Sequence, residues 1–322
     1  MKIFVTRPIP EKGLKILRDK GYEVVVNEAA RDRGATKEEV LAGIIDADAL
    51  LSILTENIDA EIMDAGKNLK IIANYAVGFD NIDFDAAKQR NIMVANTAVP
   101  KVSESVAEHT FALMLAIGHR IVEGDQFARD GKYKVWGPEL MMGADVYKKT
   151  LGIIGLGRIG KKMAYQGVRG FDMKVLYSDL KQDEEFEKEF SAVYVKEIDE
   201  LLPQCDFVSL HVPLLDSTHH LINADRIKLM KNSAFLINTS RGPVVDEKAL
   251  TEALKNEEIR GAAIDVFEFE PEITPELREL DNVIITPHTA SSTQETRDAM
   301  SVAAATNIIE ALEGRTPPNL VK

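Results

Sequence analysis

Three polar side chains lie a few residues after apolar segments that are typical of β-strands. Arg241 comes after AFLIN, Glu270 closes the turn before Pro271, and His288 comes after NVIIT and a proline. Ligands of open α/β sheets bind beyond the carboxyl ends of the strands, so these side chains are expected at one edge of a sheet. A guanidinium can bind a carboxylate through two hydrogen bonds, and an imidazole supported by a carboxylate can donate or accept a proton. The set favours proton transfer on a small acid, although spacing alone leaves an interpretation as unrelated surface charges equally open.

The other five of the six histidines carry weaker signals. His109 and His119 fall in a predicted helix, where a packing or surface role is expected, and His211 ends a predicted strand. His219 and His220 lie in a polar turn. No ligand cluster indicates a metal site, so the sequence predicts chemistry that requires no metal.

Residues 151–160 read LGIIGLGRIG, an apolar strand that leads into three glycines and then into a helical segment. In a dinucleotide-binding turn the first glycine (Gly155) permits the tight turn, the second (Gly157) lets the backbone approach a pyrophosphate, and the third (Gly160) allows close helix packing. The helix presents its N-terminal N–H groups to the phosphates. Between the glycines lie the other members of the predicted cofactor-binding turn, Leu156, Arg158 and Ile159.

A competing interpretation of the same glycines is a P-loop, because Gly155–Lys161 also fits G-x-x-x-x-G-K. The next residue is Lys162, so the serine or threonine hydroxyl that would hold Mg²⁺ is missing. The P-loop interpretation is therefore excluded.

The strand KVLYS ends at Asp179, 19 residues after Gly160. A carboxylate at this place accepts hydrogen bonds from the hydroxyls of the adenosine ribose and repels a 2′-phosphate. An acid that merely lies in a polar turn is the alternative. Because strand, turn, helix, strand and acid occur in the expected order, the sequence predicts binding of NAD in preference to NADP.

Strand-like and helix-like segments alternate along the chain in two series. Alternation of this kind predicts an α/β fold with two doubly wound parallel-sheet domains, Rossmann- or flavodoxin-like. The strand candidates of the first series are 2–6, 22–26, 49–54, 69–74 and 92–95, and those of the second are 151–154, 174–178, 207–210, 234–238, 261–265 and 282–285.

The segments between and after the two series are harder to interpret. An apolar helix is predicted over Ser103–Ile121, with Ser103 as its N-cap. Gly124–Lys149 has mixed polarity and predicts a long loop or arm. A last helix is predicted over Thr293–Glu313, and periodicity alone leaves open whether it returns to the first unit.

Composition and charge exclude several classes of function. The chain has 322 residues, and 39 Lys and Arg against 52 Asp and Glu give a net charge of −13, which disfavours nucleic acid and anionic membrane surfaces as partners. The longest apolar stretch, 111–117, is far shorter than the ~20 residues that span a bilayer, and Pro8 interrupts the N-terminus before a signal-like run develops. The only cysteine, Cys205, fits a reducing compartment. The sequence predicts a cytoplasmic protein.

Five ordered motifs resemble those of the D-isomer-specific 2-hydroxyacid dehydrogenases: LGIIGLGRIG, the acid after KVLYS, NTSRGPVVDEKAL, AAIDVFEFEP and TPHTAS. NYAVGFDNID and VANTAVPKVSESVAEHT match as well, so the resemblance covers nearly the whole chain. Within the family, the motif sequences are most similar to those of the glyoxylate and hydroxypyruvate reductases. The resemblance implies a substrate-binding domain made of residues 1–100 and 289–322, and an NAD-binding Rossmann domain, 101–288, inserted between them. It also implies a homodimer joined through residues 103–149.

The resemblance assigns roles to individual residues. The implied catalytic residues are Arg241, Glu270 and His288. Arg241 would also bind the substrate carboxylate, assisted by the backbone N–H groups of Val77 and Gly78. Beyond the glycine turn and the acid after KVLYS, the implied cofactor-binding residues are Pro213, Thr218, Thr239, Ser240, Ala290 and Asp265, the last at the nicotinamide carboxamide.

The expected reaction is NADH-dependent reduction of a small 2-oxo acid, glyoxylate or hydroxypyruvate, to the D-2-hydroxy acid. His288 would donate the proton, Arg241 would hold the carboxylate, and Glu270 would support His288. A D-lactate or branched D-2-hydroxyacid dehydrogenase is the alternative, because Leu140–Met142 lies where the glyoxylate-reductase branch often carries a second aromatic residue after Trp136. An NAD-sensing interaction protein of the corepressor type is the alternative from a different class.

Overall fold

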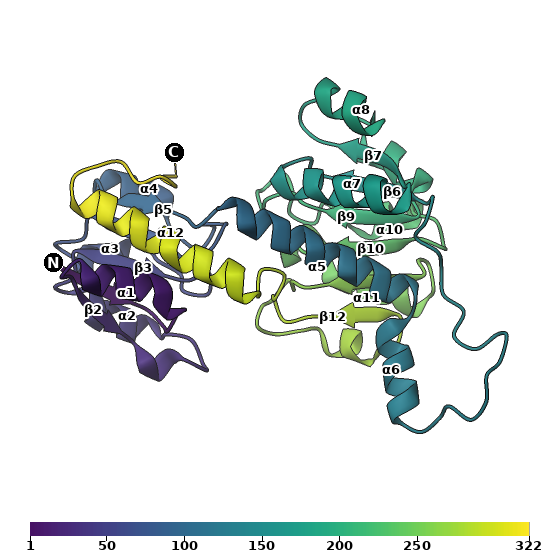
Figure 1. Cartoon of the computed structure of the whole chain (residues 1–322), viewed down its shortest axis with the longest axis horizontal. Coiled ribbons are helices and arrows are strands. Elements are labelled where there is room, and N and C mark those ends of the chain that lie inside the picture. Colours follow the sequence, from purple (N-terminus) through teal and green to yellow (C-terminus); the bar gives the residue numbers. More distant parts are fainter. Residues whose placement is uncertain (322) are drawn as a thin grey trace. The chain divides into compact units, whose positions relative to one another are not determined.

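The computed structural model describes residues 1–321 and divides the chain into two compact units (Figure 1). One unit is Met1–Val102 together with the chain from Ser292 onward, and the other is Ser103–Ser291. The family resemblance implies boundaries after residues 100 and 288, and the structure divides the chain after residues 102 and 291. The last helix belongs to the first unit.

The first unit is a five-stranded parallel sheet in the order β2-β1-β3-β4-β5. This is the order of flavodoxin-like doubly wound sheets. The strands are β1 (Lys2–Val5), β2 (Glu23–Val26), β3 (Ala49–Ser52), β4 (Ile71–Asn74) and β5 (Met93–Ala95). The helices are α1 (Glu11–Asp19), α2 (Lys37–Ile44), α3 (Ala60–Ala65), α4 (Phe84–Gln89) and α12 (Gln294–Leu312), with a short 3-10 turn η1 (Glu28–Ala30).

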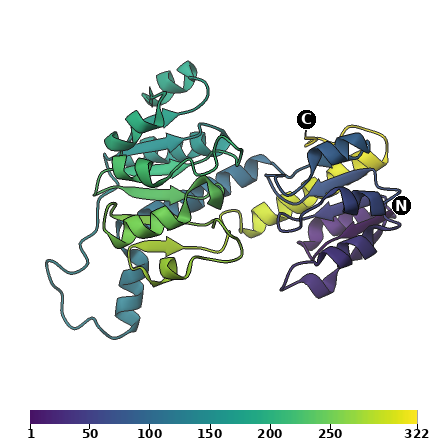
Figure 2. The same cartoon turned by 180° about the vertical axis from the view of Figure 1, so that it is seen from behind.

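Helices cover both faces of this sheet. α12 packs against α1 and against the strands β3, β4 and β5 (Figure 1). α2, α3 and α4 bury their apolar residues in a core on the other face, which Figure 2 shows from behind. Because all four residues of β3 and of β4 are buried, these strands are continuous apolar runs without alternation.

The second unit is a seven-stranded parallel sheet in the order β12-β11-β10-β9-β6-β7-β8. The strand order reverses between β6 and β9, as in dinucleotide-binding Rossmann folds. The strands are β6 (Thr150–Ile154), β7 (Lys174–Ser178), β8 (Val193–Tyr194), β9 (Phe207–Leu210), β10 (Phe235–Asn238), β11 (Gly261–Ile264) and β12 (Val283–Ile285).

Two cores hold the helices of the second unit against its sheet. One core contains residues of α5 (Pro100–Gly118), α7 (Arg158–Phe171) and α8 (Glu184–Phe190), and α5 and α7 cross the near face in Figure 1. The other core contains residues of α9 (Ile198–Leu201), α10 (Ala224–Leu229) and α11 (Glu247–Lys255). Short 3-10 turns complete the unit: η2 (Leu202–Gln204), η3 (Gly242–Val244) and η4 (Pro275–Glu279). The predicted fold class, α/β with two doubly wound parallel sheets, is confirmed.

Two local predictions are wrong. Ser103 is not the N-cap of α5, because this helix begins at Pro100, whose fixed φ and missing N–H suit the first helical position. The segment after α5 is not a loop from Gly124 onward, because α6 (Ile121–Arg129) occupies its first part. α6 has no buried residue, and i,i+4 pairs such as Arg129–Asp125 support it.

The described helices of residues 1–321 include none with both the length and the apolar character needed to cross a bilayer.

Candidate active site

The predicted cofactor turn leaves β6 and enters α7, whose N-cap is Gly157. Gly155 has φ +95°, and a Cβ on it would stand 2.8 Å from the backbone carbon of His211. A Cβ on Gly160 would stand 2.3 Å from the carbonyl oxygen of Gly155, so the helix packs closely on the turn. A Cβ on Gly157 would meet nothing within 4 Å. The turn thus leaves open space beside the N-terminus of α7, which fits a bound pyrophosphate.

Leu156, Arg158 and Ile159 lie where the sequence places them, in this turn and the first turn of α7. The Leu156 N–H donates to Asp179 Oδ2 at 2.6 Å, so the turn and the end of β7 are held together. Asp179 Oδ1 accepts from the Leu180 N–H, also at 2.6 Å. A pocket of about 430 Å³ opens here, and its lining residues are Leu156, Asp179, Lys181, Gln182, Asp183, Glu184 and Glu185.

Pro213 and Thr218 lie in the loop that follows β9, across the strand-order reversal from the glycine turn. The Thr218 hydroxyl donates to the Pro213 carbonyl at 2.7 Å and accepts from the Leu215 N–H at 2.8 Å. The side chain of Thr218 therefore holds the loop closed on itself. Ligands of open α/β sheets bind at such a reversal, so the structure brings these two residues to the edge where a dinucleotide binds.

Arg241 ends a turn after β10, and the side chain of Asn238 stabilises this turn through hydrogen bonds. Asn238 Oδ1 accepts from the N–H and the hydroxyl of Ser240, and Asn238 Nδ2 donates to the Arg241 carbonyl at 2.9 Å. The Thr239 hydroxyl lies 2.7 Å from that of Thr110 on α5. Asn238 is nearly fully buried and positions Arg241. Sequence reasoning missed it, although an asparagine that ends a strand before a turn is the signal that could have found it.

The turn of Arg241 touches the segment that carries Glu270. A Cβ on Gly242 would stand 1.8 Å from the Phe267 carbonyl oxygen, so only a glycine lets the two backbones approach this closely. Glu270 Oε1 accepts from the Phe267 N–H at 2.9 Å, which fixes the carboxylate relative to its own segment. The strand ends of β10 and β11 thus bring Arg241 and Glu270 to the same edge of the sheet.

His288 lies beside Glu270, with its Nδ1 2.9 Å from Glu270 Oε2. Both side chains are about three-quarters buried, at 28% and 29% exposure. When Nδ1 donates to the carboxylate, Nε2 is the nitrogen left to exchange a proton with a substrate. His288 has φ +54°, and its N–H donates to the carbonyls of Asp265 and Thr286 at 2.8 and 3.0 Å. The structure therefore brings together the imidazole–carboxylate pair that the sequence predicts.

Asp265 binds the loop that carries His288. Its carboxylate is fully buried and accepts from the Thr286 hydroxyl at 2.5 Å and from the N–H groups of Thr289 and Ala290, each at 2.8 Å. Burial by itself raises the pKa of Asp265, but the nearby His109 ring and the hydrogen bonds from Thr286 and these N–H groups outweigh it and hold the pKa below its usual range. Asp265 is thus an anionic anchor of the loop. Its contact with a nicotinamide carboxamide stays a prediction.

His109 takes part in the same network, where the sequence predicts only a packing or surface role. Its Nε2 lies 3.3 Å from the Thr286 hydroxyl and 3.6 Å from Asp265 Oδ1. The pairing joins α5 to the ends of β11 and β12. Because 156 positions separate His109 from Asp265 along the chain, no local motif reveals it.

Val77 and Gly78 lie in the first unit, after β4. Asn74 Nδ2 donates to the Gly78 carbonyl at 2.9 Å, and Asn96 Nδ2 donates to the Val77 carbonyl at 2.8 Å. Within residues 1–321 the N–H groups of Val77 and Gly78 donate no hydrogen bond. The carbonyl groups of this segment accept hydrogen bonds, whereas its N–H groups remain available to donate to an anion. Binding of a substrate carboxylate by these N–H groups stays a prediction.

Comparisons with known proteins bear on the whole chain. Residues 111–290 match the family described as D-isomer specific 2-hydroxyacid dehydrogenase, NAD binding domain. A glyoxylate reductase from Korarchaeum cryptofilum is 47% identical over 99% of this chain and 95% of its own length. The crystal structure of a protein from Thermus thermophilus has a TM-score of 0.93 at 41% identity, over 100% of both chains. An NADPH-dependent glyoxylate/hydroxypyruvate reductase from Sinorhizobium meliloti has a TM-score of 0.86 at 29% identity, over 99% of this chain and 97% of its own.

Proposed function

The chain belongs to the D-isomer-specific 2-hydroxyacid dehydrogenase family, and from that premise we propose that it reduces glyoxylate or hydroxypyruvate with NADH. It is an NAD-dependent oxidoreductase that acts on small 2-oxo or 2-hydroxy acids. The observation that carries the proposal is the 2.9 Å contact between His288 Nδ1 and Glu270 Oε2, beside the turn of Arg241. The glyoxylate reductase at 47% identity supports the choice of substrate.

Each of the three residues has one task in the proposed mechanism. NADH held by the glycine turn and Asp179 would supply the hydride for the carbonyl carbon. Arg241 holds the substrate carboxylate through two hydrogen bonds and orients the carbonyl. His288 gives the proton on Nε2 to the developing alkoxide oxygen, and Glu270 keeps the ring in position and stabilises its protonated form. The N–H groups of Val77 and Gly78 are proposed as further donors to the substrate.

The first expected result concerns the cofactor. The wild-type enzyme should have a higher kcat/KM with NADH than with NADPH, because the Asp179 carboxylate lies at the end of β7, beside the glycine turn, and repels a 2′-phosphate. Asp179→Ala should reduce the NADH/NADPH ratio by about 10- to 150-fold, the equivalent of the ~1.5–3 kcal/mol of a charge-assisted hydrogen bond.

The matched control is Glu185→Ala, which removes an exposed carboxylate from the same pocket and should leave the ratio nearly unchanged. The relative from Sinorhizobium meliloti is named as NADPH-dependent, so the family alone does not decide this preference. Equal or better use of NADPH by the wild type would contradict the role given to Asp179.

The second expected result concerns the substrate. We expect higher kcat/KM for glyoxylate or hydroxypyruvate than for pyruvate, 2-oxoisocaproate or phenylpyruvate, measured as NADH oxidation. One methylene changes binding by only ~1–3 kcal/mol, so pyruvate should be a slower substrate that is still turned over. A clear preference for 2-oxoisocaproate or phenylpyruvate would favour the branched-acid alternative.

The position of Leu140–Met142 in the single chain weighs against the branched-acid alternative. Met141 and Met142 line a pocket of about 520 Å³ with residues of α5, α6 and β12, and none of Arg241, Glu270 and His288 contributes to its lining. Met141 and Met142 thus face a pocket that Arg241 does not line, and the side chains of Leu140 and Met142 are 41% and 61% exposed.

The third expected result concerns assembly. The long segment that follows α6 and leads back to β6 (Figure 1) carries large apolar side chains in solvent, with Val135 75% and Trp136 74% exposed. Burying such a surface is favourable, so we propose a homodimer in which it is covered. Light scattering at micromolar concentration should give twice the 35.7 kDa mass of the chain.

Trp136→Glu should shift the mass toward that of the monomer, because a charge would enter the apolar interface. The control Val193→Glu changes an exposed apolar residue of β8 and should leave the mass unchanged. A monomeric wild type would contradict the proposed dimer.

A turnover assay with a panel of 2-oxo acids also separates the enzyme from an NAD-sensing interaction protein. Binding of NADH without turnover on any of the acids would favour the interaction protein.

The net charge of −13 and a single fully buried cysteine support a reducing, cytoplasmic location without nucleic-acid partners. Burial raises the pKa of the Cys205 thiol to about 12, so this cysteine is unreactive at neutral pH.

A further inference from the structure

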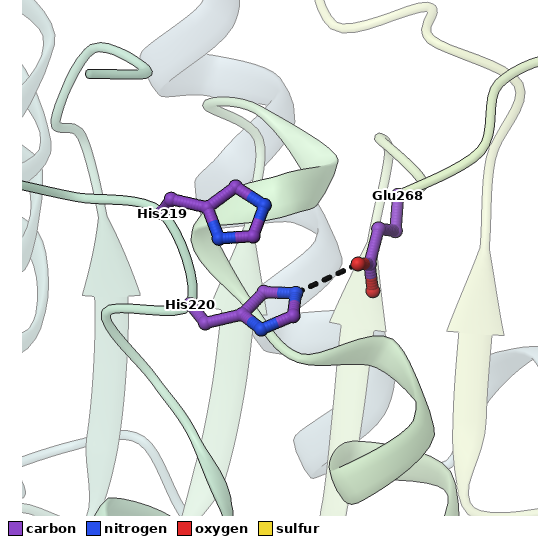
Figure 3. Close-up of side chains that lie close together, drawn as sticks. All are labelled: His219, His220 and Glu268. Atoms are coloured by element: carbon purple, nitrogen blue, oxygen red, sulfur yellow. Dashed lines mark hydrogen bonds and ion pairs between the residues drawn. The ribbon is translucent and has the colours of Figure 1, made fainter. Parts of the chain in front are cut away.

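A second group of imidazoles and a carboxylate lies in the NAD-binding unit. His219 and His220 belong to the loop after β9, and Glu268 belongs to the segment after β11 (Figure 3). One potential ligand atom from each residue lies within 4.8 Å of the other two. The expected residue types for a transition metal are thus present in a chain whose sequence indicates no ligand cluster.

The two rings lie on one side of the carboxylate. Their centroids are 4.1 Å apart with planes inclined at 30°, and Figure 3 shows each ring with a nitrogen toward the side where Glu268 lies. His220 Nε2 is 2.7 Å from Glu268 Oε1. The potential ligand atoms of the three residues therefore lie close together, as chelation of one ion requires.

The backbone and a buried acid hold the group in place. The Glu268 N–H donates to Glu247 Oε2 at 2.8 Å, and the Glu247 N–H donates to Glu268 Oε2 at 3.1 Å. Glu247 is only 2% exposed. The His220 N–H donates to the Pro243 carbonyl at 2.8 Å. Glu268 Oε1 and His220 therefore occupy fixed positions before any ion arrives, which lowers the entropic cost of binding one.

A purely structural role accounts for His220 but leaves His219 unexplained. The contact between His220 and Glu268 would by itself hold the two segments together. The ring of His219 forms no hydrogen bond with residues 1–321, although one of its nitrogens faces the same carboxylate. The side chains of His220 and Glu268 are 35% and 12% exposed, so an ion can reach them from solvent.

We propose that His219, His220 and Glu268 form a binding site for one divalent transition metal of the zinc class. Two imidazole nitrogens and a carboxylate oxygen are typical ligands of Zn²⁺, and water would complete a tetrahedral shell. Binding at His220 Nε2 moves the proton on that nitrogen to Nδ1 or to solvent, so no redox change is involved. The metal would join the loop after β9 to the segment that leads into Glu270.

The test uses the full chain after removal of metals with a chelator. Zinc is titrated against a chromogenic chelator, and one zinc per chain is expected. His219→Ala should weaken zinc binding by at least ~10-fold. Removing a residue that only hydrogen-bonds a metal ligand already lowers metal affinity by ~10- to 100-fold, and removing a ligand itself should lower it at least as much. His119→Ala, which removes an exposed histidine at the end of α5, should bind zinc as tightly as the wild type.

Two further measurements keep the outcome clear. Co²⁺ in place of zinc should give the intense visible absorption of a tetrahedral site in the wild type and lose it in His219→Ala. Glu268→Gln keeps an oxygen that can accept from the Glu247 N–H and should also weaken binding. Failure of the wild type to bind zinc would overturn the proposal. Binding that persists unchanged in His219→Ala would do so too, because the zinc would then lie elsewhere, such as on His288 and Glu270. Neither readout depends on dehydrogenase activity.

Discussion

Replacing His288 with glutamine should lower kcat by ~10²- to 10⁴-fold, the range that a positioned acid–base group contributes. Glutamine can occupy the space next to Glu270, but its amide cannot give a proton to an alkoxide. Glu270 would then orient a side chain with no transferable proton. The affinity for NADH should remain nearly unchanged, because the glycine turn and Asp179 belong to β6 and β7, at the other side of the strand-order reversal.

Two measurements separate these effects. Single-turnover kinetics at saturating NADH and substrate should show the loss in the chemical step, and fluorescence titration should show unchanged NADH binding. His119→Gln serves as the control for removal of an exposed histidine. If His288→Gln turned over at a rate near that of the wild type, another group would have to donate the proton.

Replacing Arg241 with alanine should raise KM for the 2-oxo acid and lower kcat/KM by about 30- to 5,000-fold. This range corresponds to the ~2–5 kcal/mol lost when one partner of a hydrogen-bonded charge pair is truncated. The turn should survive the change, because Asn238 holds it through the backbone of residues 240 and 241. The loss would therefore report on the carboxylate contact and not on the fold.

Arg241→Lys should recover only part of this loss, because an ammonium group keeps the charge but cannot form two parallel hydrogen bonds. Arg278→Ala, which removes an exposed arginine in η4, is the matched control and should behave as the wild type. Unchanged KM in Arg241→Ala would show that another residue binds the carboxylate.

The sequence alone determined those features that depend on local backbone requirements. Gly155 is needed for a positive φ, and Gly160 for the approach of α7 to the turn, so their spacing reveals the cofactor turn without any tertiary information. Arg241 and His288 follow apolar strands, and the carboxyl ends of parallel strands lie at one edge. Their common location therefore follows from their positions in the chain.

Only the tertiary structure decided which side chains meet. β9 and β11 flank β10, so the loops that follow them bring His220 to Glu268, 48 positions apart in the chain. The pairing of His109 with Asp265 likewise depends on how α5 packs on the sheet. α6 escaped prediction because the mixed polarity of the segment from Gly124 onward favoured a loop, and the helix buries no residue against the sheet. Motifs record what the backbone requires within a few residues, whereas side-chain contacts depend on strand order and packing, which no short stretch of sequence contains.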